Sequence, residues 1–89
     1  MGSYKILWKK SAEKDLERIE PKHVSRIIEV VESLSVNPFP LDYHKLRDVK
    51  QIYRIRVGDY RVIYQVDTKA KIVVIYYVRH RRKAYRGII

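Results

Sequence analysis

Arginine side chains dominate the chemistry that the second half of this sequence can do. Arg54, Arg56 and Arg61 lie within residues 53–64, where apolar and polar residues alternate on both sides of a Gly-Asp pair. This pattern predicts two β-strands joined by a two-residue turn. Residues that pair directly across such a hairpin point to the same side of the sheet, so the three arginines are expected to share one face. The opposite face is apolar and is predicted to face the core through Tyr53, Ile55, Val57, Tyr60, Val62 and Tyr64.

Guanidinium groups gathered on one face of a sheet suit phosphate chemistry. Like charges that face each other destabilise a sheet, so a fold keeps such a cluster most readily where an anion binds it. A solvated basic face is the alternative. Cleavage of RNA by its own 2′-hydroxyl requires that the phosphorane oxygens be neutralised, and arginine suits this because its planar donors keep their charge. His80 or Tyr85 could transfer a proton or orient the hydroxyl, although a lone histidine here more often contacts phosphate or backbone.

The positive charge is confined to the half of the chain that carries these arginines. The net charge is +10, from 20 Lys and Arg against 10 Asp and Glu. Residues 1–42 hold seven basic and seven acidic side chains, whereas residues 43–89 hold 13 basic and three acidic ones. A one-sided basic field indicates a polyanionic partner, and nucleic acid is the leading candidate. An acidic protein and an anionic membrane surface are the alternatives at this stage.

Other chemistries lack their residues in this sequence. No cysteine is present, so we expect neither disulfides nor thiolate metal sites, and a reducing, cytoplasmic location. The three histidines are scattered and the three glycines form no phosphate loop, so neither a metal nor a cofactor is expected. Asp48, Asp59 and Asp67 are turn or loop residues, which argues against a two-carboxylate hydrolase. No apolar run approaches the roughly 20 residues that a membrane-spanning helix needs.

Two helices are predicted ahead of the hairpin. Apolar residues at helical spacing predict a first helix from Ser11, a candidate N-cap, to Ile19. Pro21 suits the first position of a second helix, which the same spacing extends to Leu34. Residues 37–50 are expected to form an ordered loop or short turns. The apolar stripes of the helices need a partner surface, and the sheet supplies it.

Two further strands complete the predicted sheet. Residues 71–78 form a strand that is apolar on both faces and therefore central. The second strand of the hairpin is expected on one side of it, and a short strand of residues 4–8 on the other. We therefore predict a single α+β domain over residues 1–89. It has a small antiparallel sheet of about four strands, a helical hairpin packed on it in the order βααβββ, and a short C-terminal helical turn over residues 82–86.

The end of the last strand decides whether the basic tail meets the hairpin arginines. If residues 68–70 form a three-residue turn, Arg79 falls on the same face as Arg61. The chain beyond Arg79 then crosses the arginine cluster, and Arg81 could brace the leaving-group side of a phosphate. A frayed basic tail is the alternative.

These motifs resemble the RelE/ParE toxin superfamily. The resemblance rests on residues 53–66, on the following Val78-x-His80-Arg81 and on the closing Tyr85-Arg86. It covers nearly the whole chain, because the order of strand, two helices and three strands also fits. Among the subgroups, the sequence is most similar to RelE-type toxins.

The resemblance implies an activity, a set of partners and a set of site residues. RelE-type toxins are mRNA interferases, endoribonucleases that cleave mRNA in the ribosomal A site by 2′-hydroxyl attack. They leave a 2′,3′-cyclic phosphate and a 5′-hydroxyl, and an acidic, RelB-like antitoxin wraps and blocks them. The implied partners are therefore the antitoxin, the ribosome and mRNA, with no membrane. The family's site residues carry over to Arg54, Arg56, Arg61, Arg81 and Tyr85.

The sequence departs from RelE at the positions of Arg54 and Arg56, where RelE has lysines. A lysine can lose its proton and act as a base, but an arginine cannot at ordinary pH. His80, Tyr85 or a ribosomal group would then have to serve, and the spacing to Tyr85 is two residues shorter here. Two alternatives remain: a ParE-like poison of DNA gyrase without RNase activity, and a non-catalytic protein whose basic face only holds an acidic antitoxin.

Overall fold

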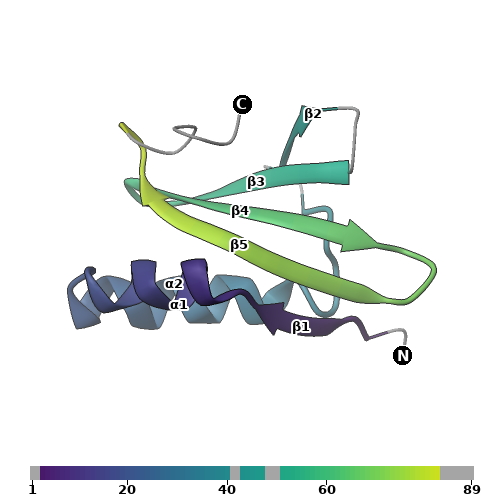
Figure 1. The fold of residues 1–89 in the computed structure, drawn as a ribbon, viewed down its shortest axis with the longest axis horizontal. Coiled ribbons are helices and arrows are strands. Elements are labelled where there is room, and N and C mark those ends of the chain that lie inside the picture. Colours follow the sequence, from purple (N-terminus) through teal and green to yellow (C-terminus); the bar gives the residue numbers. More distant parts are fainter. Residues whose placement is uncertain (1–2, 41–42, 48–50, 83–89) are drawn as a thin grey trace.

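Two helices cover one face of a five-stranded sheet in the computed structural model (Figure 1). The structure describes residues 3–40, 43–47 and 51–82. The predicted α+β class with a helical hairpin on a small sheet is confirmed. The predicted C-terminal helical turn lies largely outside the described residues. The elements follow the order β1 (Lys5–Trp8), α1 (Lys10–Glu17), α2 (Pro21–Ser33), β2 (His44–Arg47), β3 (Ile52–Val57), β4 (Tyr60–Asp67) and β5 (Ile72–His80).

The strand order in the sheet is β1-β5-β4-β3-β2, so β5 lies between β4 and β1 as predicted. The β3–β4 and β4–β5 pairs are antiparallel, but β1 runs parallel to β5. The expectation of a purely antiparallel sheet was therefore wrong for this pair. A hairpin fixes the direction of two strands that follow each other in the chain, whereas β1 reaches β5 only through tertiary packing.

The prediction of a loop over residues 37–50 was wrong for the segment that forms β2. This strand pairs antiparallel with the outer edge of β3, and its register shifts between Lys45 and Arg47. The segment His-Lys-Leu-Arg has no apolar alternation that would have indicated a strand. Its conformation follows from the edge of β3, whose unpaired backbone groups bind it.

Both helices form close to their predicted positions. The prediction that Ser11 caps α1 was wrong, because the N-cap is Lys9 and carries no side-chain cap. Ser11 instead lies inside the helix, and its hydroxyl donates a hydrogen bond to the Tyr76 carbonyl. In α2, Pro21 occupies the start of the helix as predicted, and Leu34 is its C-cap.

The core lies between the helices and the near face of β3, β4 and β5. The predicted hairpin register is confirmed, with Val57 opposite Tyr60, Arg56 opposite Arg61 and Ile55 opposite Val62. The apolar face of the hairpin is buried as expected, apart from Tyr60, which is half-buried. The core comprises Ala12, Ile27, Val31 and Leu34 from the helical layer, and Tyr53, Ile55, Val57, Val62, Tyr64, Val66, Val73, Ile75 and Val78 from the sheet.

Helix α1 closes the edge of β5 where β1 has ended. The Lys9 amide donates a 2.9 Å hydrogen bond to the Ile75 carbonyl, and the Ser11 hydroxyl donates one to the Tyr76 carbonyl. A carboxylate oxygen of Asp15 then accepts a 2.9 Å hydrogen bond from the Val78 amide. Side chains of α1 thus continue the hydrogen bonding that β1 begins, and they hold α1 against the end of β5.

Two irregularities set which side chains of β5 face which way. The turn before β5 has four residues rather than the predicted three, because Asp67 pairs with Ile72. The Asp67 carboxylate stabilises this turn by accepting from the amides of Lys69 and Ala70. One extra residue would reverse the faces of β5, but the register shifts back at Tyr76, between the Tyr64–Ile75 and Ile63–Tyr77 pairs. Arg61 therefore pairs directly with Arg79. The two arginines share a face through the four-residue turn and the bulge together, and not through the three-residue turn on which the expectation depended.

No helix among residues 3–40, 43–47 and 51–82 has the length and apolar character needed to cross a lipid bilayer.

Replacing Tyr64 by phenylalanine should destabilise the fold. Tyr64 is fully buried, and its hydroxyl donates a 2.8 Å hydrogen bond to the Pro38 carbonyl, so Tyr64→Phe leaves a buried acceptor unpaired. We expect the free energy of unfolding to fall by about 1–2 kcal/mol. Urea titration should show a lower midpoint with an unchanged slope. The matched control is Tyr76→Phe, which removes a hydroxyl bonded to Gln65 at a half-buried position, and it should cost less.

Candidate active site

Three arginines lie side by side across three neighbouring strands. Arg56 of β3 pairs directly with Arg61 of β4, and Arg61 pairs directly with Arg79 of β5. We call these three residues the arginine row. Adjacent strands are about 4.8 Å apart, so the row extends over about 10 Å of backbone. It lies on the distal face, the face of β3–β5 that points away from α1 and α2, because its neighbours Val57 and Val62 are buried in the core.

Arg54 adds a fourth guanidinium to the distal face, two residues ahead of Arg56. Its Nε is buried and has no hydrogen-bond partner within the described structure. Buried donors of this kind are rare in folded proteins, because an unpaired donor loses its hydration without compensation.

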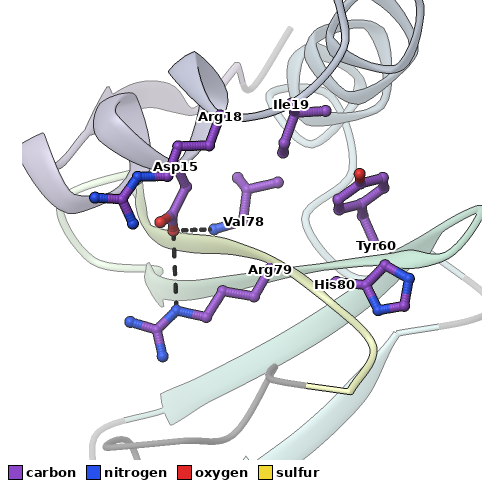
Figure 2. Close-up of a pocket in the computed structure, with 7 residues that line it drawn as sticks. All are labelled: Asp15, Arg18, Ile19, Tyr60, Val78, Arg79 and His80. Carbon is purple, nitrogen blue, oxygen red and sulfur yellow. Dashed lines mark hydrogen bonds and ion pairs between the residues drawn. The ribbon is translucent and has the colours of Figure 1, made fainter.

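The arginine row is held in place at its centre and at its β5 end. At β4, Nη1 of Arg61 lies 3.3 Å from the Tyr60 carbonyl and 3.5 Å from the Gly58 carbonyl. At β5, Nε of Arg79 lies 4.0 Å from a carboxylate oxygen of Asp15, and its guanidinium lies 4.0 Å from the centre of the Tyr77 ring. Figure 2 shows the Asp15 carboxylate between the Val78 amide and the Arg79 side chain. The row is thus a set of ordered cations and not a frayed basic surface.

Arg81 lies just beyond β5 and next to the turn of the β3–β4 hairpin. Its amide donates a 2.8 Å hydrogen bond to the Asp59 carbonyl, which carries the β4–β5 pairing one residue past His80. The Arg81 side chain is exposed. Among the sequence-predicted site residues, the structure therefore brings together Arg54, Arg56 and Arg61, and places Arg81 at the same end of the sheet. Tyr85 lies outside the described residues.

His80 lies on the other side of β5. Successive residues of a strand point to opposite faces, so His80 follows Arg79 onto the side of the helices. Its ring lies 5.7 Å from that of Tyr60, in an edge-to-face arrangement. The two rings line a cleft of about 380 Å³ beside α1 (Figure 2), together with Asp15, Arg18, Ile19, Val78 and Arg79. His80 thus shares this cleft with Arg79, but it lies on the opposite face of the sheet from Arg54, Arg56 and Arg61.

Arg79 is the member of the row that was absent from the predicted site. Its only sequence signal was its place at the end of an apolar strand, and the face that it occupies depends on the turn length and the bulge in β5. Among the described residues, no group of three or more His, Cys, Asp or Glu side chains could hold a metal ion. The site therefore offers fixed positive charge and hydrogen-bond donors.

Comparison with known proteins supplies the family. A family model for the ParE toxin of type II toxin-antitoxin systems matches residues 6–85. The putative toxin RelE1 of Methanocaldococcus jannaschii is 32% identical over 77 residues, which are 83% of this chain and 86% of that protein. The toxin RelE of Mycobacterium tuberculosis is 31% identical over 84 residues, covering 93% of this chain and 87% of that protein.

Solved structures agree with this assignment. The archaeal RelE–RelB complex from Pyrococcus horikoshii contains a chain with 33% identity and a TM-score of 0.80, covering 92% of this chain and 99% of that chain. The RelBE2 toxin-antitoxin complex from Mycobacterium tuberculosis gives 28% identity and a TM-score of 0.78, with 89% and 92% covered. The chain belongs to the RelE/ParE toxin superfamily. Within it, the chain is a RelE-type toxin of a type II toxin-antitoxin system.

Neutralising the centre of the arginine row should stabilise the fold. Arg61 has a guanidinium-bearing residue directly opposite on each side, and like charges so placed destabilise a sheet. Arg61→Gln should therefore raise the free energy of unfolding by about 0.2–1 kcal/mol at low ionic strength. The gain should shrink at about 1 M salt, where the screening length is about 3 Å.

Urea titrations at low and high salt measure this effect. The matched control is Arg26→Gln, which removes one positive charge from the exposed side of α2 and should leave stability unchanged. A loss of stability for Arg61→Gln at both salt concentrations would show that the row is not electrostatically strained.

Proposed function

We propose that this toxin is a ribosome-dependent endoribonuclease that cleaves mRNA in the A site. In this proposal the 2′-hydroxyl attacks the adjacent phosphate, and the products are a 2′,3′-cyclic phosphate and a 5′-hydroxyl. The observation that carries the proposal is the arginine row with Arg54 beside it on the distal face. The positive charges of Arg54, Arg56 and Arg61, which share this face, match the negative charge that develops on a phosphorane.

The arginines would act mainly by binding and neutralising charge. Guanidinium forks bind phosphate oxygens in pairs and stay charged at every relevant pH. The fold holds their backbones in register before the substrate arrives, so little reorganisation is needed when charge builds up. This part of the reaction needs no side chain that titrates near neutral pH.

Proton transfer has to come from another group. Arginine cannot serve as a base, and His80 lies on the helix side of β5, against Tyr60. This placement favours Tyr85 or a ribosomal group as the proton carrier, of which the toxin can supply only Tyr85. Dependence on the ribosome follows naturally, since the ribosome can orient the message and complete the site.

We also propose an acidic, RelB-like antitoxin as the protein partner. Relatives of known structure are complexes of RelE with RelB, and the surplus charge of this chain lies in residues 43–89. An acidic segment across the distal face would neutralise the arginine row and exclude RNA. The toxin is accordingly expected to work inside the cytoplasm, where its ribosomal target and antitoxin are found.

A ParE-like function is the second candidate, because the matching family model carries that description. A gyrase poison would stop supercoiling and leave messages intact. Primer extension on a translated message after induction, with a gyrase supercoiling assay in parallel, separates the two. Cuts at A-site codons support the proposed function, whereas supercoiling arrest with intact messages overturns it. Neither effect would indicate a protein that only binds its antitoxin.

Arg81→Ala should abolish toxicity without unfolding the protein. The Arg81 side chain is exposed, so its loss should change stability by less than about 0.5 kcal/mol. Loss of one donor to the charge of a transition state typically lowers the rate by about 10²–10³-fold. Growth arrest and message cleavage measure the activity, and thermal melts measure folding.

Lys22→Ala is the matched control, since Lys22 is an exposed cation on α2. It should arrest growth like the wild type. If Arg81→Ala also arrests growth at the wild-type dose while melting normally, Arg81 is not part of the active centre.

The antitoxin should dissociate more readily when charge in the arginine row is reversed. We expect the toxin to co-purify at low salt with the acidic product of a neighbouring gene. Arg61→Glu should weaken this complex and reduce the salt dependence of its dissociation constant, because buried and rim charges on the interface would then repel. Lys22→Glu should leave both quantities unchanged. Separate elution of the wild-type pair at low salt would rule out that neighbour as the antitoxin.

A further inference from the structure

The arginine row has one member that the family pattern does not assign. Arg79 continues the row from the hairpin onto β5, in direct register with Arg61. Resting on the proposed function, we infer that Arg79 binds the phosphate next to the scissile one. Arg79 is then a substrate-binding residue, whereas Arg54, Arg56 and Arg61 bind the reacting phosphate.

The position of Arg79 in the sheet separates it from the reacting phosphate. Arg54 and Arg56 lie on β3 and Arg61 on β4, so all three belong to the hairpin and share one face of it. Arg79 stands on β5, one strand further, at a backbone distance of about 10 Å from β3. An RNA backbone that crosses the strands would therefore present successive phosphates to the two ends of the row.

The surroundings of Arg79 hold it ready for a phosphate. Its guanidinium lies over the Tyr77 ring, which fixes the plane of the fork. Asp15 lies at the 4.0 Å limit of an ion pair, and both side chains are partly exposed, at 26% and 17%. The 4.0 Å separation is longer than a charge-assisted hydrogen bond, so a phosphate that accepts from the guanidinium directly can compete with Asp15 for it.

Asp15 loses little when Arg79 turns to a ligand. Its carboxylate also accepts the 2.9 Å hydrogen bond from the Val78 amide, which belongs to the framework of the fold. This bond keeps Asp15 satisfied and keeps α1 attached to β5. Release of Arg79 to RNA therefore leaves the edge of the sheet closed, and the protein needs no rearrangement to bind.

The test compares Arg79→Ala, Arg79→Lys and the wild type on ribosomes programmed with a message. In the message used for binding, hydrogen replaces the scissile 2′-hydroxyl, so that affinity is measured without cleavage. Each phosphate contact adds about 0.7 to the slope of log affinity against log salt on single strands. Arg79→Ala should lower this slope by about 0.7 and raise the dissociation constant, whereas Arg79→Lys should restore the slope.

Cleavage of the all-ribose message gives the second readout. Arg79→Ala should raise KM and leave the rate at saturation unchanged, because the contact is uniform binding away from the reacting atoms. Arg18→Ala is the matched control. Arg18 lines the same cleft from the end of α1 but is not a member of the arginine row, so its loss should leave slope and KM unchanged.

Three outcomes overturn the inference. They are a wild-type slope and KM for Arg79→Ala, an equal slope change for Arg18→Ala, and a fall in the saturating rate alone. If Arg79→Ala melts early, Arg79→Gln, which keeps a polar side chain but removes the charge, takes its place, and a wild-type slope for it overturns the inference. A wild type that binds but never cuts the all-ribose message overturns the proposed nuclease function instead. The slope comparison still decides Arg79 in that case, because it requires no cleavage.

Discussion

The pairing register of β3, β4 and β5 is the constraint on which the rest of this structure depends. The side-chain period of a strand is two, so a slip of one residue would exchange the two faces of the sheet. The register that puts Val57, Val62 and Val78 into the core also sets Arg56, Arg61 and Arg79 opposite one another on the distal face. Burial of the apolar face therefore holds together cations that repel each other. The site needs no interaction of its own to form.

The packing of the core must therefore offset the electrostatic repulsion between the arginines of the site. Like charges at directly opposed positions oppose folding, and the sheet tolerates them because its other face is fully packed beneath two helices (Figure 1). Asp15 relieves the repulsion at the β5 end, through a pair that is partly exposed. A natural anion that covers the distal face, whether message or antitoxin, would relieve it more completely. Binding and folding are thus linked through the same few charges.

Local signals in the sequence were enough for the hairpin and the helices. A Gly-Asp turn with Gly58 at φ +61 and strict alternation on either side fixed the register of β3 and β4, and helical spacing fixed α1 and α2. The predictions that were wrong concern residues whose structure depends on partners distant in the chain. The sequence of β2 has no alternation that predicts a strand. Ser11 does not cap α1 as predicted, because its hydroxyl is hydrogen-bonded to Tyr76 of β5, 65 residues away. The three-residue turn on which the shared face of Arg61 and Arg79 was made to depend does not form, and the two share a face because a bulge in β5 compensates the extra turn residue. Asp15 could not be assigned a role, since nothing local marks a helix carboxylate as the partner of a strand end.

The closure of the β5 edge by α1 has a consequence for how the toxin behaves at high concentration. An open strand edge is a template on which another chain can add its own strand, and this is a common route to aggregation. Next to the arginine row this edge is closed. The Tyr76 carbonyl accepts a hydrogen bond from Ser11, and the Val78 amide donates one to Asp15. Two copies cannot join their sheets at this end, where mutual burial would cover the charged surface. The same contacts that anchor a short helix thereby deny this stretch of the β5 edge to a strand from a second molecule.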